Sequence, residues 1–106
     1  MPLIPVETVT LAEHAGQDAV AGLTAFKGVI LNSTAGVGKL TLYKGDNASG
    51  TVIAILTTTA EKPTEIYMLP ADYVEHCPLG IFYALVDSTG VSTAYLKHIP
   101  RPTPTQ

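Results

Sequence analysis

The stretch KLTLYKGDNASGTVIAILT, residues 39–57, decides the fold class. Its first six residues place Leu40 and Leu42 on one face and polar or aromatic residues on the other, which is the period of a half-buried strand. Residues 45–50 hold two glycines with Asp, Asn and Ser, which hairpin loops favour. Residues 51–57 then alternate again. One face of this second strand holds Val52, Ala54 and Leu56, and the other holds Ile53 and Ile55.

Outward from this hairpin, short apolar segments separated by turn residues continue in both directions, as in a sandwich or barrel. Further strands are expected at residues 6–11, 26–32, 64–69, 79–86 and 91–99. Residues 12–22 are rich in alanine and stay open, with a helical turn ending near Gly16 as one alternative, and Pro70 is able to begin a single helical turn. The pattern predicts an all-β, antiparallel β-sandwich, jelly-roll or immunoglobulin-like, of about seven to eight short strands.

The two ends of the chain differ from its middle. Prolines stand at positions 2 and 5, and residues 100–106 read PRPTPTQ. Prolines favour extended geometry and cannot donate to a sheet ladder. A chain of 106 residues holds one core. We therefore expect an N-terminal arm over residues 1–5, a sandwich domain over residues 6–99 and a proline-rich tail over residues 100–106.

Charge and hydropathy argue against several classes of partner. The net charge is −3, and the six Lys and Arg residues are scattered and form no stripe that could neutralise phosphates, so no nucleic acid is expected. The longest apolar run, residues 79–86, is too short to span a bilayer. The N-terminus lacks the basic and apolar regions of a signal peptide. The sequence therefore predicts a soluble protein that is not secreted by a signal peptide and has no membrane partner.

Two motifs resemble catalytic signatures but lack required parts. Residues 33–40 read STAGVGKL, in which Ser33 stands where a phosphate-binding loop needs glycine and Leu40 stands where it needs Ser or Thr. Glu75-His76-Cys77 is the densest reactive cluster, but adjacent residues of an extended segment point to opposite sides. No catalytic residue is predicted, and the chain is not expected to be an enzyme.

Metal sites are also poorly supported. The three histidines are isolated in sequence, whereas zinc needs three or four ligands from spaced pairs. Asp46 with Asn47, or Asp87 with Ser88, could offer oxygens to calcium, but neither loop carries enough acids for six or more ligands. We therefore predict neither a metal nor a cofactor.

An interface is the remaining candidate for function. Residues 79–86 are apolar at both parities, as in a strand buried on both sides or one whose outer face meets another subunit. Exposed tyrosines could form an interface or a sugar-stacking platform, although the absence of tryptophan counts against the latter. The candidate interface residues are Tyr43, Tyr67, Phe82, Tyr83, Pro100 and Pro102.

Residues 26–32, 42–46 and 50–54 (FKGVILN, LYKGD and GTVIA) carry a resemblance. They are similar to segments of small structural proteins of tailed bacteriophages. The resemblance implies a capsid decoration or head-accessory protein, located in the virion, whose partners are the major capsid protein or other virion subunits. It also favours a homotrimer, because decoration proteins often occupy local three-fold points. The alternative is a carbohydrate-binding or adhesin-like module of a phage tail or fibre.

Overall fold

The computed structural model describes residues 6–34, 37–70, 72–88 and 90–100. All regular structure in these ranges is β-strand, in nine strands, so the predicted all-β class is confirmed. Within the same ranges there is no helix long and apolar enough to cross a membrane. The strands are β1 (Glu7–Leu11), β2 (His14–Ala21), β3 (Thr24–Thr34), β4 (Gly38–Lys44), β5 (Thr51–Thr57), β6 (Thr64–Met68), β7 (Glu75–Cys77), β8 (Gly80–Asp87) and β9 (Val91–Pro100).

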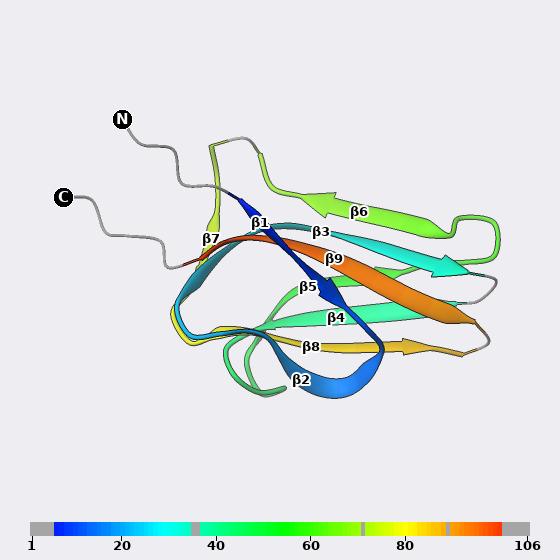
Figure 1. Cartoon of the computed structure of the whole chain (residues 1–106), viewed down its shortest axis with the longest axis horizontal. Helices are drawn as coiled ribbons and strands as arrows, with labels where there is room; N and C mark the ends of the chain where they lie inside the picture. Colours follow the sequence, from blue (N-terminus) through cyan, green and yellow to red (C-terminus); the bar gives the residue numbers. More distant parts are fainter. Residues whose placement is uncertain (1–5, 35–36, 71, 89, 101–106) are drawn as a thin grey trace.

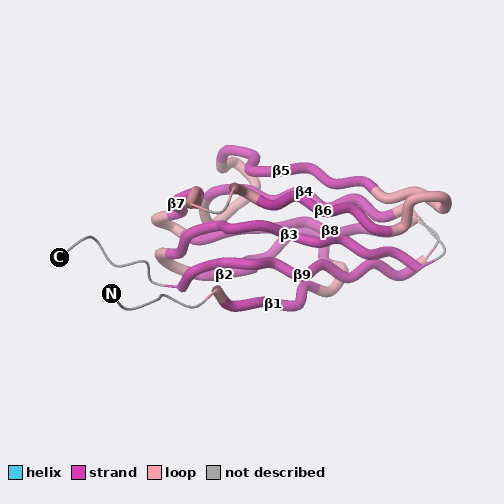
Figure 2. The backbone as a smooth tube through the Cα atoms, turned by 90° about the horizontal axis from the view of Figure 1, so that it is seen from above, coloured by secondary structure: helices cyan, strands magenta, loops and turns pink. Residues whose placement is uncertain are grey.

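The strands form two antiparallel sheets packed face to face (Figure 1). The five-stranded sheet has the order β1-β9-β3-β6, and β7 also pairs with β3 beside one end of the sheet. The four-stranded sheet has the order β2-β8-β4-β5. Seen from above the layers, β5 and β1 lie at opposite sides of the sandwich (Figure 2). The predicted antiparallel β-sandwich is therefore confirmed.

The core lies between the sheets and consists of alternate residues of their strands. Leu40 and Leu42 of β4 are fully buried, as the opening alternation predicts, and so is Leu85 of β8. Burying aliphatic side chains of this size stabilises the fold by about 1.5–3 kcal/mol each. The other fully or nearly fully buried apolar residues include Phe26, Val29, Leu31, Leu56, Ile81, Tyr83 and Leu96.

The structure settles one open segment and adds one strand that the sequence did not predict. Residues 14–21 form β2 and not a helical turn, because they pair with β8 through two register irregularities. Gly16 lies against the Phe82 ring, where a Cβ would come within 3.1 Å, so a small residue fits this edge strand. The short β7 was not expected, because three residues carry no readable alternation. Near Pro70, a hydrogen bond from the Tyr73 N–H to the Pro70 carbonyl (3.0 Å) closes a turn.

β8 is buried on one face only within a single copy of the chain. Ile81, Tyr83 and Leu85 face the core, whereas Phe82 is half-buried and Val86 is 53% exposed. Of the two interpretations of its double apolar pattern, burial on both sides is therefore wrong for the isolated chain. The other interpretation, that its outer face meets another subunit, stays a prediction.

Candidate interaction surfaces

Tyr83 belongs to the core and not to an interface. Its side chain is 1% exposed, its hydroxyl donates to the Ala12 carbonyl (2.7 Å), and it accepts from the Gln17 Nε2 (2.8 Å). The expectation that Tyr83 contacts a partner was therefore wrong. Alternation places Tyr83 and its neighbour Phe82 on opposite faces of β8, and the sequence alone does not say which face is the inner one.

The outer face of the four-stranded sheet carries an apolar patch, which is interrupted on β4 by Lys39 and Thr41. The Tyr43 ring of β4 meets the Phe82 ring of β8 edge-on, with centroids 6.0 Å apart and an interplanar angle of 62°. The register continues the patch along both neighbours, because Tyr43 pairs with Val52 of β5 and Thr41 lies between Ile55 and Ala84. We call this surface the outer patch. It consists of Tyr43, Val52, Ile55, Phe82, Ala84 and Val86.

A bulge in β5 extends the outer patch beyond what alternation predicts. Leu42 pairs with Ala54 and Tyr43 with Val52, so Ile53 is the extra residue. Ile53 and Ala54 both pack against the core, and Val52 turns outward beside Tyr43. A bulge of this kind reverses the faces of the residues on its far side. The expectation that Val52 shares one face with Ala54 and Leu56 was therefore wrong.

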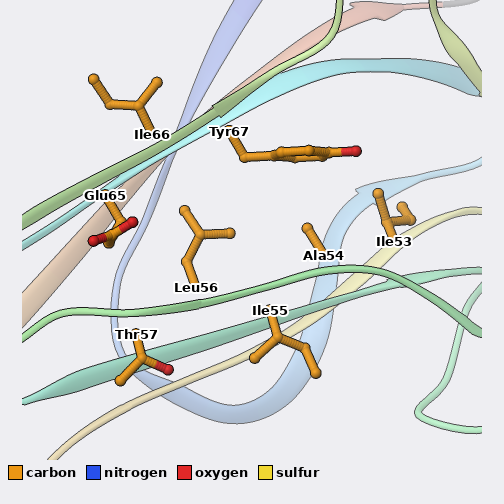
Figure 3. A pocket seen from close by; sticks show the side chains of 8 residues that line it. All are labelled: Ile53, Ala54, Ile55, Leu56, Thr57, Glu65, Ile66 and Tyr67. Atoms are coloured by element: carbon orange, nitrogen blue, oxygen red, sulfur yellow. The ribbon is translucent and has the colours of Figure 1, made fainter.

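A groove runs between the edge strands β5 and β6, where the sandwich is open (Figure 3). Its volume is about 330 Å³. Leu56 and Ala54 project into it from β5, and Tyr67 projects from β6, whereas Ile66 points away (Figure 3). The Tyr67 ring is 40% exposed and stacks on the buried Phe26 ring, with centroids 6.1 Å apart. The groove thus combines apolar side chains and a positioned aromatic ring with the polar side chains of Thr57 and Glu65.

The two proline candidates have different positions. Pro100 is the last residue of β9 and lies opposite Thr24 of β3. Pro102 lies outside the described residues, as do the other residues of the predicted tail beyond Pro100 and the predicted arm, residues 1–5.

The Gly-rich segment before β4 is a strand connection and not a phosphate loop. Lys39 is the second residue of β4, so no helix N-terminus follows it to face an anion. The Gly38 N–H donates to the Thr58 Oγ1 (2.9 Å), and the Gly38 carbonyl accepts from the Thr58 N–H (2.9 Å). These two hydrogen bonds hold the start of β4 beside the end of β5.

The Glu75-His76-Cys77 segment does not bring a nucleophile and a base together. It forms β7, with Cys77 buried and His76 exposed on the opposite face. Burial raises the pKa of the Cys77 thiol, so the neutral form is favoured. Glu75 forms an ion pair with Lys44 and raises the pKa of that ammonium group. The arrangement joins β7 to β4 and offers no activated thiolate.

Asp87 organises the turn after β8. Its carboxylate accepts hydrogen bonds from the hydroxyls of Ser33 and Ser92 and from the Gly90 N–H (2.7 Å). The backbone N–H of Ser92 donates to the Glu13 carboxylate (2.9 Å). No histidine joins these serines to make a nucleophile. Across the described ranges, no three His, Cys, Asp or Glu side chains lie close enough together to hold a metal ion.

His98 is a buried polar residue that sequence reasoning did not single out. Its Nδ1 lies 2.9 Å from the Thr24 Oγ1, and its Nε2 is a buried atom with no hydrogen-bond partner among the residues that the structure describes. Desolvation lowers the pKa of His98, although the nearby Glu7 carboxylate opposes the shift. The alternation Ala94, Leu96, His98 along β9 was the available signal, because it places His98 on the inner face.

Comparisons of this chain with protein families, with curated proteins and with solved structures find no match. The inference of function therefore rests on the outer patch and the groove.

Proposed function

We propose that this chain is a structural protein of a tailed-phage virion, a decoration protein that stabilises the head by bridging capsid subunits. The observation that carries the proposal is the outer patch on the four-stranded sheet. Together with the phage-like segments of the sequence, it favours a protein whose task is docking. In the virion, its partner is the major capsid protein.

The outer patch has the composition of an interface core. Tyr43 and Phe82 are aromatic and hold each other in place, so little side-chain freedom is lost when a partner covers them. Aromatic residues are enriched at the centres of protein interfaces, and charged residues are depleted there. Contiguous exposed apolar surface of this kind usually marks a binding surface.

Many weak contacts with one shell together hold linked copies of the chain on it stably. When several copies are linked, the second contact becomes intramolecular, and the combined affinity rises without a new type of contact. A small, mainly uncharged sandwich with an apolar face can therefore bind at many equivalent points. The low content of charged residues, 14%, removes the like-charge repulsion that dense packing would otherwise produce.

Co-sedimentation with empty heads of the phage that encodes the chain tests the proposal. Two matched variants separate the outer patch from general surface change. Val86→Asp places a charge in the patch on β8, and Val91→Asp places the same charge on β9 of the other sheet. The wild type and Val91→Asp should pellet with heads, and Val86→Asp should not. A wild-type chain that stays in the supernatant would overturn the proposal.

A carbohydrate-binding or adhesin-like module is the second candidate, and the groove favours it. Tyr67 and the half-buried Glu65 line the same groove, which combines a stacking ring with a hydrogen-bond acceptor. A glycan array separates the two functions. Specific binding that is lost in Tyr67→Ala and kept in Val86→Asp would favour the sugar-binding function over docking.

A further inference from the structure

We infer that residues 101–106 of one copy add as an extra edge strand to β6 of a second copy, with Pro102 and Pro104 in the groove between β5 and β6. The inference deepens the proposed function, because it names how the copies are linked, but its geometry stands on the backbone of β6. β-strand addition needs an unpaired edge and a segment whose donors match it.

Hydrogen bonds at both ends of β6 establish which of its groups face β3. The Leu69 N–H donates to the Lys27 carbonyl (3.0 Å), and the Ser33 N–H donates to the Pro63 carbonyl (2.9 Å). In an antiparallel ladder, every second residue makes such bonds, and the residues between them point their N–H and C=O groups away. The residues of β6 whose backbone groups point away from β3 are Thr64, Ile66 and Met68.

This outer edge of β6 pairs with no other strand within the described ranges. It also carries exposed apolar side chains, since Ile66 is 62% exposed and Met68 is nearly half exposed. Natural proteins usually protect such edges with charge, proline or a covering segment. An apolar edge that offers three outward-facing residues is therefore a site for strand addition.

The proline spacing of the tail matches this edge. Prolines occupy positions 100, 102 and 104, and the residues between them are Arg101, Thr103 and Thr105. In an extended backbone, successive N–H groups point to opposite edges, so these three residues offer their N–H groups on the same edge. The prolines fall where an N–H would point away from β6, so nothing is lost by their missing donors.

Pairing in this register also places the prolines in the groove. Residues that form a hydrogen-bonded pair across an antiparallel ladder have their side chains on the same face. Arg101, Thr103 and Thr105 therefore share the outward face with Ile66. The prolines take the opposite face, beside Tyr67 and Leu56. Aromatic-lined grooves are the surfaces that extended, proline-rich segments favour.

The donor must come from a second copy because residues 101–106 cannot reach β6 of their own chain in this pairing. Pro100 lies opposite Thr24, whereas the near end of β6, at Met68, lies opposite Gly28. That offset is about 13 Å along β3, and crossing from β9 past β3 adds about 10 Å. Six residues span at most about 20 Å, so almost none remain to pair. A head-to-tail donation between copies gives a ring where the rotation between them closes, and the expected trimer is one such ring.

Two proline substitutions in the full chain test the inference by light scattering at micromolar concentration. Ile66→Pro removes an outward N–H of β6, and Thr103→Pro removes the middle donor of the tail. The matched control is Thr103→Ala, which changes the same side chain but keeps its backbone N–H.

The wild type and Thr103→Ala should have the mass of an oligomer, most simply three chains. Ile66→Pro and Thr103→Pro should fall to the mass of one chain, 11.1 kDa. Thr103→Pro lies outside the sandwich, so its result holds even if Ile66→Pro fails to fold. A monomeric wild type, or an oligomer that survives Thr103→Pro, would overturn the inference. Val86→Asp separates the oligomer test from the head-binding test. This variant should lose head binding but keep the oligomer mass of the wild type.

Discussion

Tyr43 packs edge-on against Phe82 on the outer face of the four-stranded sheet, at a centroid distance of 6.0 Å. Tyr43 lies on β4 and Phe82 on β8, so the contact joins the two central strands of that sheet on its exposed side. An aromatic pair placed there adds little to the core between the sheets. We therefore attribute it to docking, and the first prediction concerns it.

Phe82→Ala should weaken head binding while leaving the fold intact. Phe82 is half-buried, so removing its ring destabilises the fold less than removing a core ring would. The substitution also leaves the Tyr43 ring without its edge-on contact. A central aromatic residue of an interface typically contributes 2 kcal/mol or more, or roughly thirtyfold in affinity. Titration of labelled chain onto empty heads measures the change. Tyr95→Ala, on the other sheet, is the control and should bind like the wild type.

Leu85→Ala should destabilise the sandwich by about 2–5 kcal/mol because it opens a cavity in the core. Leu85 is fully buried on the inner face of β8. Its neighbour Val86 faces outward, so Val86→Ala should change the free energy of unfolding by less than about 1 kcal/mol. Urea unfolding of the two variants makes the comparison. Equal losses would mean that the faces of β8 are assigned wrongly.

His98 should make the fold less stable in mild acid. Its folded-state pKa is lowered from the ordinary value of 6.5, because the buried imidazole is desolvated. The unfolded chain therefore takes up a proton before the folded chain does. The contribution is fully present above pH 6.5 and is lost as the pH falls from 6.5 toward the folded-state pKa.

Urea unfolding of the wild type between about pH 7.5 and pH 5 measures this loss. In His98→Gln, which cannot be charged, the free energy of unfolding should change less across the same range. Identical slopes in the two proteins would show that another group causes the pH dependence. His76→Gln is the matched control, since His76 is exposed on β7, and it should retain the wild-type slope.

Cys77→Ser and Lys39→Ala should both leave head binding unchanged. Cys77 is a buried thiol whose raised pKa favours the neutral form, and Lys39 stands in a strand with no anion site before it. A thiol reagent should accordingly react with Cys77 only when the chain is unfolded. Loss of binding in a folded Cys77→Ser variant would reopen the catalytic interpretation, whereas loss in Lys39→Ala would show that the lysine beside Val86 takes part in docking.

Gly80→Ala should destabilise the chain more than Gly22→Ala. Both glycines have positive φ, +100° and +83°, where a side chain is strained by about 1 kcal/mol. A Cβ at Gly80 would also come within 2.3 Å of the Val20 carbonyl oxygen, whereas nothing lies within 4 Å at Gly22. Thermal unfolding of both variants tests the order. A larger loss in Gly22→Ala would contradict the close approach of β2 to the start of β8.

Sequence reasoning predicts the fold well wherever alternation and turn chemistry agree. β5 begins and ends at the predicted residues, Thr51 and Thr57. The polar loop over residues 45–50 marks its start, and the five residues between its terminal threonines are all apolar. β2 was missed because alanine and glycine carry little periodicity, and its pairing with β8 decides its structure. The bulge at Ile53 could not be foreseen, since it depends on how two strands pair and not on either alone.

The candidate surfaces were only partly readable from the sequence. Tyr43 and Phe82 were named as interface candidates, but their contact depends on the register of β4 against β8. Tyr83 was misplaced because both faces of β8 are apolar, and only the second sheet shows which face is inner. The groove has no sequence signal, because Leu56 and Tyr67 meet there through the stacking of two sheet edges.

The heat stability of empty heads, measured with and without the chain, tests the central claim most directly. If the chain bridges capsid subunits, saturating wild-type protein should raise the temperature at which the heads disassemble, because it binds the assembled shell and not its separated subunits. Val91→Asp should raise it equally, and Val86→Asp should not. Heads that disassemble at the same temperature with and without the wild-type chain would contradict the account.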